Sequence, residues 1–475
     1  MSNAQGSDRV PDTHSKALKI NLDNRRYGTF AEIGAGQEVV RWFFRVGGAA
    51  GTIAKSMSAY DMEVSDAIYG KAERYVCRPR LQRMLDYEYD LNLSRLLETR
   101  GSSTAFFAFA DTVSARNYKG TNECHGWMGV KFQSHPRDQF SQIIIHVRML
   151  DSENALQQEA LGIVGVNLLF GAFFLFHAPE QLIESLLDGL TTQRIEIDMI
   201  EFSGIEFRLV DNRLMGMKLV QIGLSGVTMF APDGAVLQPS EALHKKNVLV
   251  ERGSFRPVCH ANTDMLRCAR MSFDRDLGPE AGPTIELMEL TMRDLREEGG
   301  EVDRADFLAR ADMLAACGKT VIISDYFEYY RLAGYLFSYT KKNIAITMGA
   351  SSLADLLDEK YYTTLPGGIL ESLGRLFKND LRLYIYPFVE PGTNEMVTVE
   401  TLKVAPRLQK LYGYLVDSGY VRQLEGANRD YLQIFSRDAL RKIKEGDPTW
   451  ESMVPLEVAT LIKERRLLGY RPSRV

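Results

Sequence analysis

The sequence predicts a mixed α/β fold, α+β overall: a β-rich middle with a long buried helix, then a parallel βαβαβ unit and a small C-terminal winged-helix-like module. Three patterns support it. Buried strands alternate with helices between 320 and 386, alternating residues cover 194–202, and an uncharged apolar run covers 160–176. Buried strands that alternate with helices are typical of a parallel sheet with right-handed crossovers.

Composition indicates an ordinary globular protein of several packed units. The 475 residues are about three times the length of an average domain. Hydrophobic residues at 45% and charged residues at 25% argue against a disordered, collagen-like or coiled-coil chain. The net charge of −5 favours neither nucleic acid nor an anionic membrane as a partner.

Cysteine usage and the first residues indicate the cytoplasm. The five cysteines are odd in number and widely scattered, which fits reduced thiols better than a disulfide framework. Residues 1–15 are polar and lack the apolar core of roughly 7–15 residues that a secretory signal contains. We therefore expect a cytoplasmic protein.

We expect six segments along the chain, distinguished by the spacing of apolar residues. Helical spacing dominates before residue 100, and short strand-like runs dominate the stretch that follows. The segments are a disordered tail (1–17), a mainly helical segment (18–100), a β-rich domain (101–260), a Rossmann-like α/β unit (261–395), a winged-helix-like module (396–446) and a second tail (447–475).

Two features stand out in the β-rich domain. Apolar residues alternate with acidic ones from 195 to 199 and the phase slips at Met199-Ile200, which predicts a strand with a β-bulge. The run 160–176 has no charge but is shorter than the roughly 20 residues of a membrane span and lacks flanking Lys/Arg. We expect a buried core helix over 155–176; a membrane segment and a self-association helix are the alternatives.

The parallel unit offers the main candidate ligand site. If the strands 320–324, 344–348 and 381–386 are parallel neighbours, their carboxyl ends share one edge, where ligands of such sheets bind. Small residues there open two helices, whose free N–H groups favour a phosphate or carboxylate. The candidate ligand-binding residues are Ser324, Asp325, Gly349, Ser351, Ser352, Gly367 and Gly368. Asp325 could take a ribose hydroxyl, a metal or a proton. Alternatively, these residues only start helices.

A secondary candidate is the turn that contains Gly34 and Gly36. A strand that ends in Gly-x-Gly before a helix can present N–H groups to an anion. The third glycine of a dinucleotide fingerprint is replaced by Val39, so a plain tight turn is the alternative. The stretch 49–56 ends like a P-loop but lacks both required glycines.

Other motifs predict no chemistry. The histidines at 125, 135 and 146 lie on or between two strand candidates, but no C-x-x-C or H-x-x-x-H spacing occurs, so we expect no metal site. His146 is expected to be a hydrogen-bonded strand histidine. Asp111 follows a buried strand as in aspartyl-phosphate phosphatases, yet their second Asp is Val113 here. The catalytic residues and any cofactor stay unknown, and so does whether the protein is an enzyme.

The winged-helix-like module is predicted from a helix (399–418), a hairpin (419–424 with 431–435) and a second helix (436–445). Its basic residues are largely balanced by acidic ones, whereas phosphate binding needs a net basic face. We expect a packing or dimerisation module, with DNA contact as the alternative.

Four strings taken together resemble a widespread family of bacterial cytosolic proteins of about this length, over most of 18–445. They are YGTFAEIGAGQEVVRWFFRVGGAAGTIAKSMSAYDMEVSDAIYG (27–70), FFAFADTVSAR (106–116), HGWMGVKFQ (125–133) and IIIHVRMLD (143–151). Members carry labels such as TonB-dependent receptor or nicotinate-nucleotide adenylyltransferase. The sequence supports neither: it predicts no signal peptide or membrane barrel, and 28–32 repeats only the start of the adenylyltransferase loop, without its histidines. The resemblance implies a cytosolic protein and no catalytic residue.

Two functions from different classes fit these observations. The first is a soluble cytosolic protein that binds a nucleotide-like or phosphorylated small molecule in the α/β unit, and we favour it. The second is a self-assembling structural protein that forms a homo-oligomer or filament. The tyrosine-rich stretch 326–339 suits a core or an interface equally. We expect self-association under both hypotheses.

Overall fold

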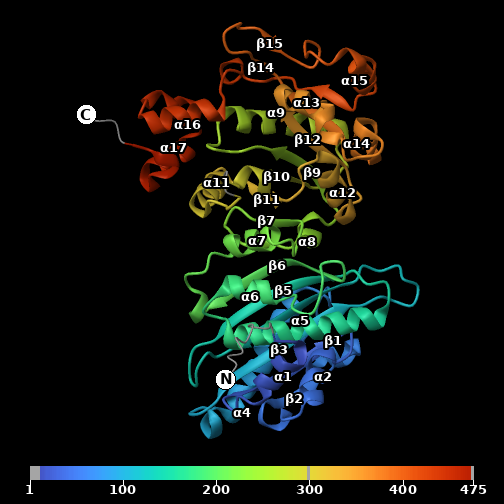
Figure 1. The fold of residues 1–475 in the computed structure, drawn as a ribbon, viewed down its shortest axis with the longest axis vertical. Coiled ribbons are helices and arrows are strands. Elements are labelled where there is room, and N and C mark those ends of the chain that lie inside the picture. The colour runs from blue at the N-terminus through green and yellow to red at the C-terminus, as the bar shows by residue number, and fades with distance from the viewer. Residues whose placement is uncertain (1–10, 297–299, 472–475) are drawn as a thin grey trace, which may run out of the picture. The chain divides into compact units, whose positions relative to one another are not determined.

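The structure is a computed structural model that describes residues 11–296 and 300–471. The chain forms two compact units, 1–225 and 226–475. The sequence predicts a boundary near 260 instead. The difference arises because the strand Asn247–Arg252 pairs within the sheet of the second unit, whereas its sequence alone resembles the strands of the β-rich stretch. The α/β fold class is confirmed (Figure 1).

The first unit is built on a six-stranded sheet in the order β2-β1-β3-β4-β5-β6. Strands β2, β1 and β3 are parallel, and the remaining pairs are antiparallel. The strands are β1 (Arg26–Ile33), β2 (Ile53–Met57), β3 (Ala105–Ser114), β4 (His125–Phe132), β5 (Ser141–Met149) and β6 (Ile195–Gly204). The predicted helical segment 18–100 thus supplies two strands to this sheet and is not a separate body.

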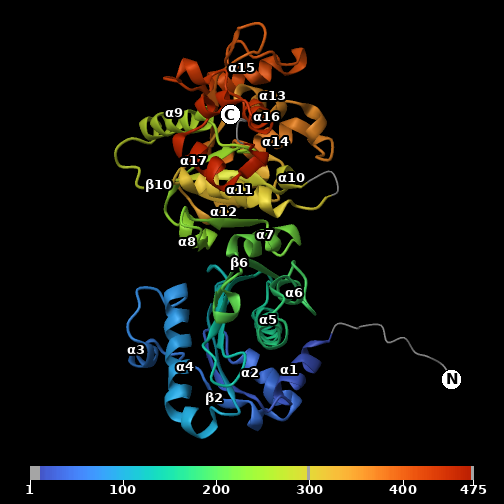
Figure 2. The same ribbon diagram turned by 90° about the vertical axis from the view of Figure 1, so that its left-hand side faces the viewer.

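Helices cover both faces of this sheet. Figure 2 shows α4 on one face and α1, α2 and α5 on the other. The helices are α1 (Thr13–Asn21), α2 (Glu38–Val46), α3 (Met62–Tyr69), α4 (Arg78–Arg100), α5 (Asn154–Phe174), α6 (Pro179–Ser185) and α7 (Asn212–Gln221), with short 3₁₀ turns η1 (Ala49–Gly51) and η2 (Ile205–Phe207). Strand β3 alternates accordingly: Phe107 and Phe109 join the α5 core, and Phe106 and Ala108 pack with α4.

The apolar helix α5 lies in the core of the first unit, as predicted. It is the one helix among the described residues that is long and apolar enough to cross a membrane, and 83% of its most apolar window is buried inside the protein. Asn167 at its centre accepts a hydrogen bond from Lys16 (2.9 Å) and donates one to the Leu186 carbonyl (2.9 Å). Lys16 also pairs with Asp188 (2.5 Å). This network ties α5 to α1 and to the chain after α6.

The predicted β-bulge is present in β6, one residue earlier than expected. The register between β5 and β6 shifts where His146 pairs with Met199 and Val147 pairs with Ile197. Asp198 is therefore the extra residue of the bulge, and its side chain lies on the same face as His146.

The second unit contains an eight-stranded sheet in the order β16-β13-β12-β9-β10-β11-β7-β8. The strands are β7 (Val227–Phe230), β8 (Val236–Leu237), β9 (Asn247–Arg252), β10 (Thr284–Thr291), β11 (Thr320–Ser324), β12 (Ile344–Gly349), β13 (Arg382–Tyr386) and β16 (Val421–Gln423); β14 (Phe388–Val389) and β15 (Met396–Val397) form a separate hairpin. The six strands from β16 to β11 are parallel. In chain order they run 6-5-4-1-2-3, the arrangement of doubly wound dinucleotide-binding folds.

This order corrects one expectation. The strands 344–348 and 381–386 are parallel neighbours, but 320–324 is separated from them by β9 and β10. The sequence does not reveal this separation because crossover connections place the first strand of such a fold at its centre.

Helices again cover both faces of the sheet. Those named in chain order are α8 (Pro239–Leu243), α9 (His260–Leu277), α10 (Met292–Leu295), α11 (Arg304–Ala316), α12 (Tyr329–Tyr339), α13 (Ala350–Leu356), α14 (Gly368–Leu376), α15 (Gln409–Asp417), α16 (Ser436–Glu445) and α17 (Leu456–Arg465). The 3₁₀ turns are η3 (Glu359–Tyr362), η4 (Lys378–Asp380), η5 (Pro406–Leu408), η6 (Arg429–Tyr431), η7 (Pro448–Met453) and η8 (Leu467–Gly469). Helices α9 and α11 contact one face, and α12 and α13 contact the other, with α8 and α14 packed on α12.

The C-terminal part differs from the predicted winged-helix-like module. The hairpin does not form, because 421–423 joins the main sheet as β16, parallel to β13. Asn428 caps η6, and its backbone N–H donates to Asp264 on α9 (2.9 Å), so 431–435 is not a strand. The predicted tails also contain structure: α1 begins at Thr13, and η7, α17 and η8 occupy most of 447–475. Residues 1–10 and 472–475 lie outside the described part of the chain.

Candidate functional site

A cavity of about 260 Å³ opens in the second unit at the carboxyl ends of β9, β10 and β11 and beside α13. The strand order reverses between β9 and β12, and ligands of doubly wound sheets bind at that reversal. The cavity is lined by Arg252, Thr291, Arg293, Asp294, Phe327, Glu328, Tyr329, Ser352, Asp355, Leu356, Tyr361 and Tyr362.

Arg252 forms the floor of this cavity. Its Nε and Nη2 atoms donate to the two carboxylate oxygens of Glu289 at 2.8 and 2.9 Å, and Nη2 and Nη1 also donate to the carbonyls of Tyr326 (2.9 Å) and Phe327 (2.5 Å). Burial opposes the charge, but Glu289 outweighs it and raises the pKa of Arg252. A bidentate pair of this kind fixes geometry as well as charge, so Arg252 joins β9, β10 and the chain after β11.

Aromatic rings and a second arginine form the walls. The guanidinium of Arg252 lies 4.1 Å from the ring centroid of Tyr329, and that of Arg293 lies 4.3 Å from the ring of Phe327. Phe327 also meets the ring of Tyr361 edge-on, at 5.4 Å between centroids. Burial raises the pKa of Tyr329 to about 12, so its phenol keeps its proton. Flat rings beside arginines suit a ligand with a planar ring or an anionic group.

Three carboxyl groups complete the lining and make its charge mixed. Asp294 accepts a hydrogen bond from the Thr291 hydroxyl (2.8 Å), and Glu328 lies 3.6 Å from Arg331. Asp355 is exposed on α13. Carboxylates accept hydrogen bonds from hydroxyl groups, so the lining of the cavity suits a ligand that carries both an anionic group and hydroxyl groups.

Among solved structures, the chain is similar to the competence/damage inducible protein CihA of Agrobacterium tumefaciens, at 14% identity and a TM-score of 0.26 over 35% of this chain and 98% of that chain. It is also similar to a CinA superfamily protein of Enterobacter cloacae, at 12% identity and a TM-score of 0.26 over 36% of this chain and 98% of that one. No protein-family model and no curated protein matches the chain. The α/β class of the chain rests on its own strand pairing.

Of the predicted ligand-binding residues, Ser352 lines the cavity, and the other six are not among its lining residues. Ser324 is buried and its hydroxyl donates to Glu289 (2.5 Å), so it supports Arg252 from behind. Asp325 is exposed, and its N–H pairs with the carbonyl of Gly226 next to β7. The sequence pattern identifies the correct edge of the sheet but not the lining.

The two predicted helix N-termini do not form one anion site. Gly349 and Ser351 begin α13, which has seven residues, too few for a substantial helix dipole. At the start of α14, the N–H of Gly367 donates to the side chain of Glu371 (2.8 Å), so Gly367 and Gly368 present an end that the helix itself caps.

The secondary candidate, the turn with Gly34 and Gly36, is also capped from within. The Glu32 carboxylate accepts hydrogen bonds from the N–H groups of Val39 (3.0 Å) and Val40 (2.8 Å) at the start of α2. An anion would have to displace this buried carboxylate. Gly34 is needed for packing, since its φ is +106° and a Cβ there would lie 1.9 Å from the Val113 carbonyl oxygen. These contacts favour the tight-turn alternative.

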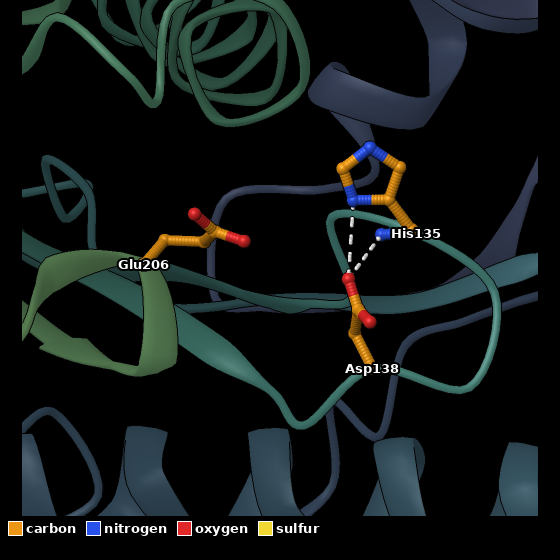
Figure 3. A group of neighbouring side chains, drawn as sticks. All are labelled: His135, Asp138 and Glu206. Atoms are coloured by element: carbon orange, nitrogen blue, oxygen red, sulfur yellow. Dashed lines mark hydrogen bonds and ion pairs between the residues drawn. The ribbon is translucent and has the colours of Figure 1, made fainter.

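One group of possible metal ligands lies on the first unit, and the sequence pattern does not single it out. His135, Asp138 and Glu206 have side-chain ligand atoms within 4.8 Å of one another (Figure 3). Nδ1 of His135 lies 3.1 Å from Asp138, and the hydroxyl oxygen of Ser134 lies 2.8 Å from Asp138 and 2.5 Å from Glu206. These bonds close the turn after β4, and we assign no metal to it.

The residues that the sequence analysis missed are Arg252, Arg293 and the aromatic rings at 327, 329 and 361. Arg252 ends the strand NVLVER (247–252), and a charged residue at the end of a buried strand is the signal that could have found it. Arg293 and Phe327 lie in short segments after β10 and β11, where no spacing rule applies.

Proposed function

We propose that the second unit binds a nucleotide-like small molecule in the cavity at the carboxyl ends of β9, β10 and β11. The observation that carries the proposal is the arginine–aromatic wall, Arg293 over Phe327 beside Tyr361, in a cavity at the carboxyl edge of a sheet with the strand order 6-5-4-1-2-3. A base can stack on such rings, Arg293 offers charge to a phosphate, and Asp355 or Asp294 can accept bonds from sugar hydroxyls.

The volume of the cavity and the sequence of the loop between β9 and α9 favour a mononucleotide over a dinucleotide as the ligand. A volume of about 260 Å³ is just under the range of roughly 300–1,000 Å³ for pockets that bury drug-sized ligands. The loop from β9 to α9 contains Gly253 but no Gly-x-Gly-x-x-Gly run, so the close backbone approach that a pyrophosphate needs is absent.

The test is equilibrium binding of AMP, adenosine, ribose 5-phosphate and inorganic phosphate to the full chain, by calorimetry and thermal shift. Stacking contributes about 1–3 kcal/mol per base, so Phe327→Ala should weaken AMP binding roughly tenfold. Arg293→Ala should weaken AMP and leave adenosine nearly unchanged.

The matched controls are an exposed aromatic residue and an exposed arginine elsewhere on the second unit: Tyr414→Ala on α15 and Arg441→Ala on α16. Both should bind AMP as the unaltered protein does. The proposal fails if no compound of the set shifts the melting temperature, or if Phe327→Ala binds AMP with unchanged affinity.

Self-association in the cytoplasm is the second proposal. Tyr60, Met62 and Val64 are 74%, 62% and 50% exposed at the start of α3, and adjacent exposed apolar side chains mark interaction surfaces. The five free cysteines fit a reducing compartment.

A further inference from the structure

The charged groups that line the cavity of the second unit do not all balance one another. Among the described residues, the lining contains two guanidinium groups, those of Arg252 and Arg293, and three carboxylates, those of Asp294, Glu328 and Asp355. Charges a few ångströms apart near a protein surface interact strongly. A ligand with only anionic groups would therefore leave at least one of these carboxylates without a compensating charge.

Three of the five charged groups already have partners within the protein. The buried carboxylate of Glu289 accepts from Arg252 at 2.8 and 2.9 Å. Glu328 has an arginine of α12 at 3.6 Å, and Asp294 accepts a hydrogen bond from the Thr291 hydroxyl at 2.8 Å. These contacts exist without a ligand, so they do not define what the cavity binds.

The two remaining charges, on Arg293 and Asp355, have opposite signs. The guanidinium of Arg293 lies 4.3 Å from the centroid of the Phe327 ring, and Asp355 is exposed on α13. Within residues 11–296 and 300–471, neither side chain forms a hydrogen bond or an ion pair, with each other or with another group. The cavity therefore offers one cation and one anion to a ligand.

The order of the strands places these two side chains on opposite sides of Arg252. Strand β9, which ends at Arg252, lies between β10 and β12 in the sheet. Arg293 lies directly after β10, whereas Asp355 lies on α13, which follows β12. A ligand that spans the cavity therefore meets a positive charge at one end and a negative charge at the other.

Aromatic rings of the lining extend to the helix that carries Asp355. The Phe327 ring meets that of Tyr361 at 5.4 Å between centroids. Tyr362, the next residue, donates its phenol O–H to the carbonyl of Leu356 at the end of α13 (2.7 Å). Aromatic faces attract both flat rings and cations, so a flat cation suits the end of the cavity beside Asp355.

We propose that the cavity selects a nucleotide whose base carries a positive charge. This inference rests on the proposed function of the cavity and adds to it the charge of the base. The phosphate lies at Arg293, a sugar hydroxyl donates to Asp294, and the cationic base lies beside Asp355 among the aromatic rings. A carboxylate next to a flat cation supplies an attraction that a neutral base of the same shape does not gain.

The test compares two isomeric nucleotides that differ in charge, by calorimetry with the full chain at slightly acidic pH. The base of 1-methyladenosine 5′-monophosphate is positively charged there, whereas that of N6-methyladenosine 5′-monophosphate is neutral. The 1-methyl isomer should bind roughly tenfold more tightly than the N6-methyl isomer or AMP, the gain of a partly desolvated cation beside aromatic rings. 7-Methylguanosine 5′-monophosphate against GMP repeats the comparison with the methyl group elsewhere on the ring.

Asp355→Asn tests the residue to which the preference is assigned. The amide keeps the shape and a carbonyl acceptor but removes the charge, so the variant should bind the two methylated isomers with affinities that agree within about twofold. The loss should fall on the 1-methyl isomer alone. Asp417→Asn, at an exposed aspartate on α15 outside the lining, is the matched control and should retain the full preference.

The outcomes separate this inference from the nucleotide site on which it rests. If both cationic nucleotides bind no more tightly than their neutral counterparts, while Phe327→Ala weakens all of them, the cationic base is overturned and the nucleotide site stands. If neither AMP nor any methylated nucleotide binds, both proposals are overturned. A preference for the 1-methyl isomer that survives Asp355→Asn overturns the role of Asp355.

Discussion

Two carboxyl groups of the first unit, Glu32 and Asp111, are register partners on β1 and β3 and both are buried. Burial raises the pKa of Glu32 to about 7, although two backbone N–H groups of α2 oppose the rise, and burial also raises the pKa of Asp111 well above its ordinary range. Two buried carboxyl groups on paired positions of neighbouring strands do not both ionise readily. The pair therefore retains a proton near neutral pH. Loss of that proton at higher pH lowers the free energy of unfolding, because two buried charges then face each other.

Asp111→Asn should flatten the dependence of stability on pH. Burial raises the pKa of Glu32 from its ordinary value of 4.5 to about 7 in the folded chain, so the folded state binds more protons than the unfolded state between these pH values. The contribution of this carboxyl pair to stability is greatest below about pH 4.5 and falls as the pH rises through 7. Removing one acid should reduce this fall by on the order of 1–2 kcal/mol. Urea unfolding at several pH values measures it, with the exposed Asp90→Asn as control; equal losses at all pH values would contradict the prediction.

Glu251 on β9 gives a second prediction at the residue scale. Its Oε1 accepts from Asn262 (2.9 Å), its Oε2 has no hydrogen-bond partner among the described residues, and burial raises its pKa to about 8. Stability that the neutral acid provides at low pH is therefore lost as the pH rises through 8. Glu251→Gln keeps the acceptor without the charge and should melt higher than the unaltered chain above pH 8. Glu251→Ala should lose about 1–3 kcal/mol at every pH, and a Gln variant that melts lower at high pH would refute the assignment.

At the scale of elements, the spacing of apolar residues predicted single helices and strands, but it did not predict which strands pair when they lie far apart along the chain. The helix expected at 155–176 is α5, Asn154–Phe174, and the strand at 320–324 is β11. In contrast, β9 was assigned to the wrong domain, because its neighbours β10 and β12 lie far along the chain. The same holds for the candidate site. Strand and turn patterns indicated the carboxyl edge of the sheet where the cavity lies. They did not indicate that Arg252 and Phe327 are neighbours, because that depends on the order of the strands in the sheet.

Close helix packing in the first unit yields a prediction for α5. A Cβ on Gly165 would lie 2.3 Å from Cγ2 of Val39 on α2, too close for the core to adjust without moving a helix. Gly165→Ala should therefore cost about 1–3 kcal/mol of unfolding free energy. Gly374→Ala on α14 is the matched control, since nothing lies within 4 Å of its Cβ position, and it should gain up to about 1 kcal/mol from helix propensity. Similar effects of the two variants in urea unfolding would show that α2 and α5 are not in close contact.

At the scale of the whole molecule, each unit has its own sheet and its own buried core. In the second unit, the cavity proposed to bind a nucleotide-like molecule lies at the carboxyl ends of the parallel strands β9, β10 and β11. That cavity does not explain the exposed apolar residues at the start of α3.

The proposed self-association would bury those residues, and it can be tested by the mass of the particle in solution. Light scattering of the full chain in reducing buffer should give a mass well above the 53.6 kDa of one chain, since the burial of Tyr60, Met62 and Val64 by a second copy is favourable. Met62→Glu places a charge in that contact and should return the mass to 53.6 kDa with little change in melting temperature, because Met62 is 62% exposed. Leu456→Glu, at an isolated residue 80% exposed on α17, should leave the assembly intact. A monomer at micromolar concentration would contradict self-association, and an assembly that survives Met62→Glu would place the interface elsewhere.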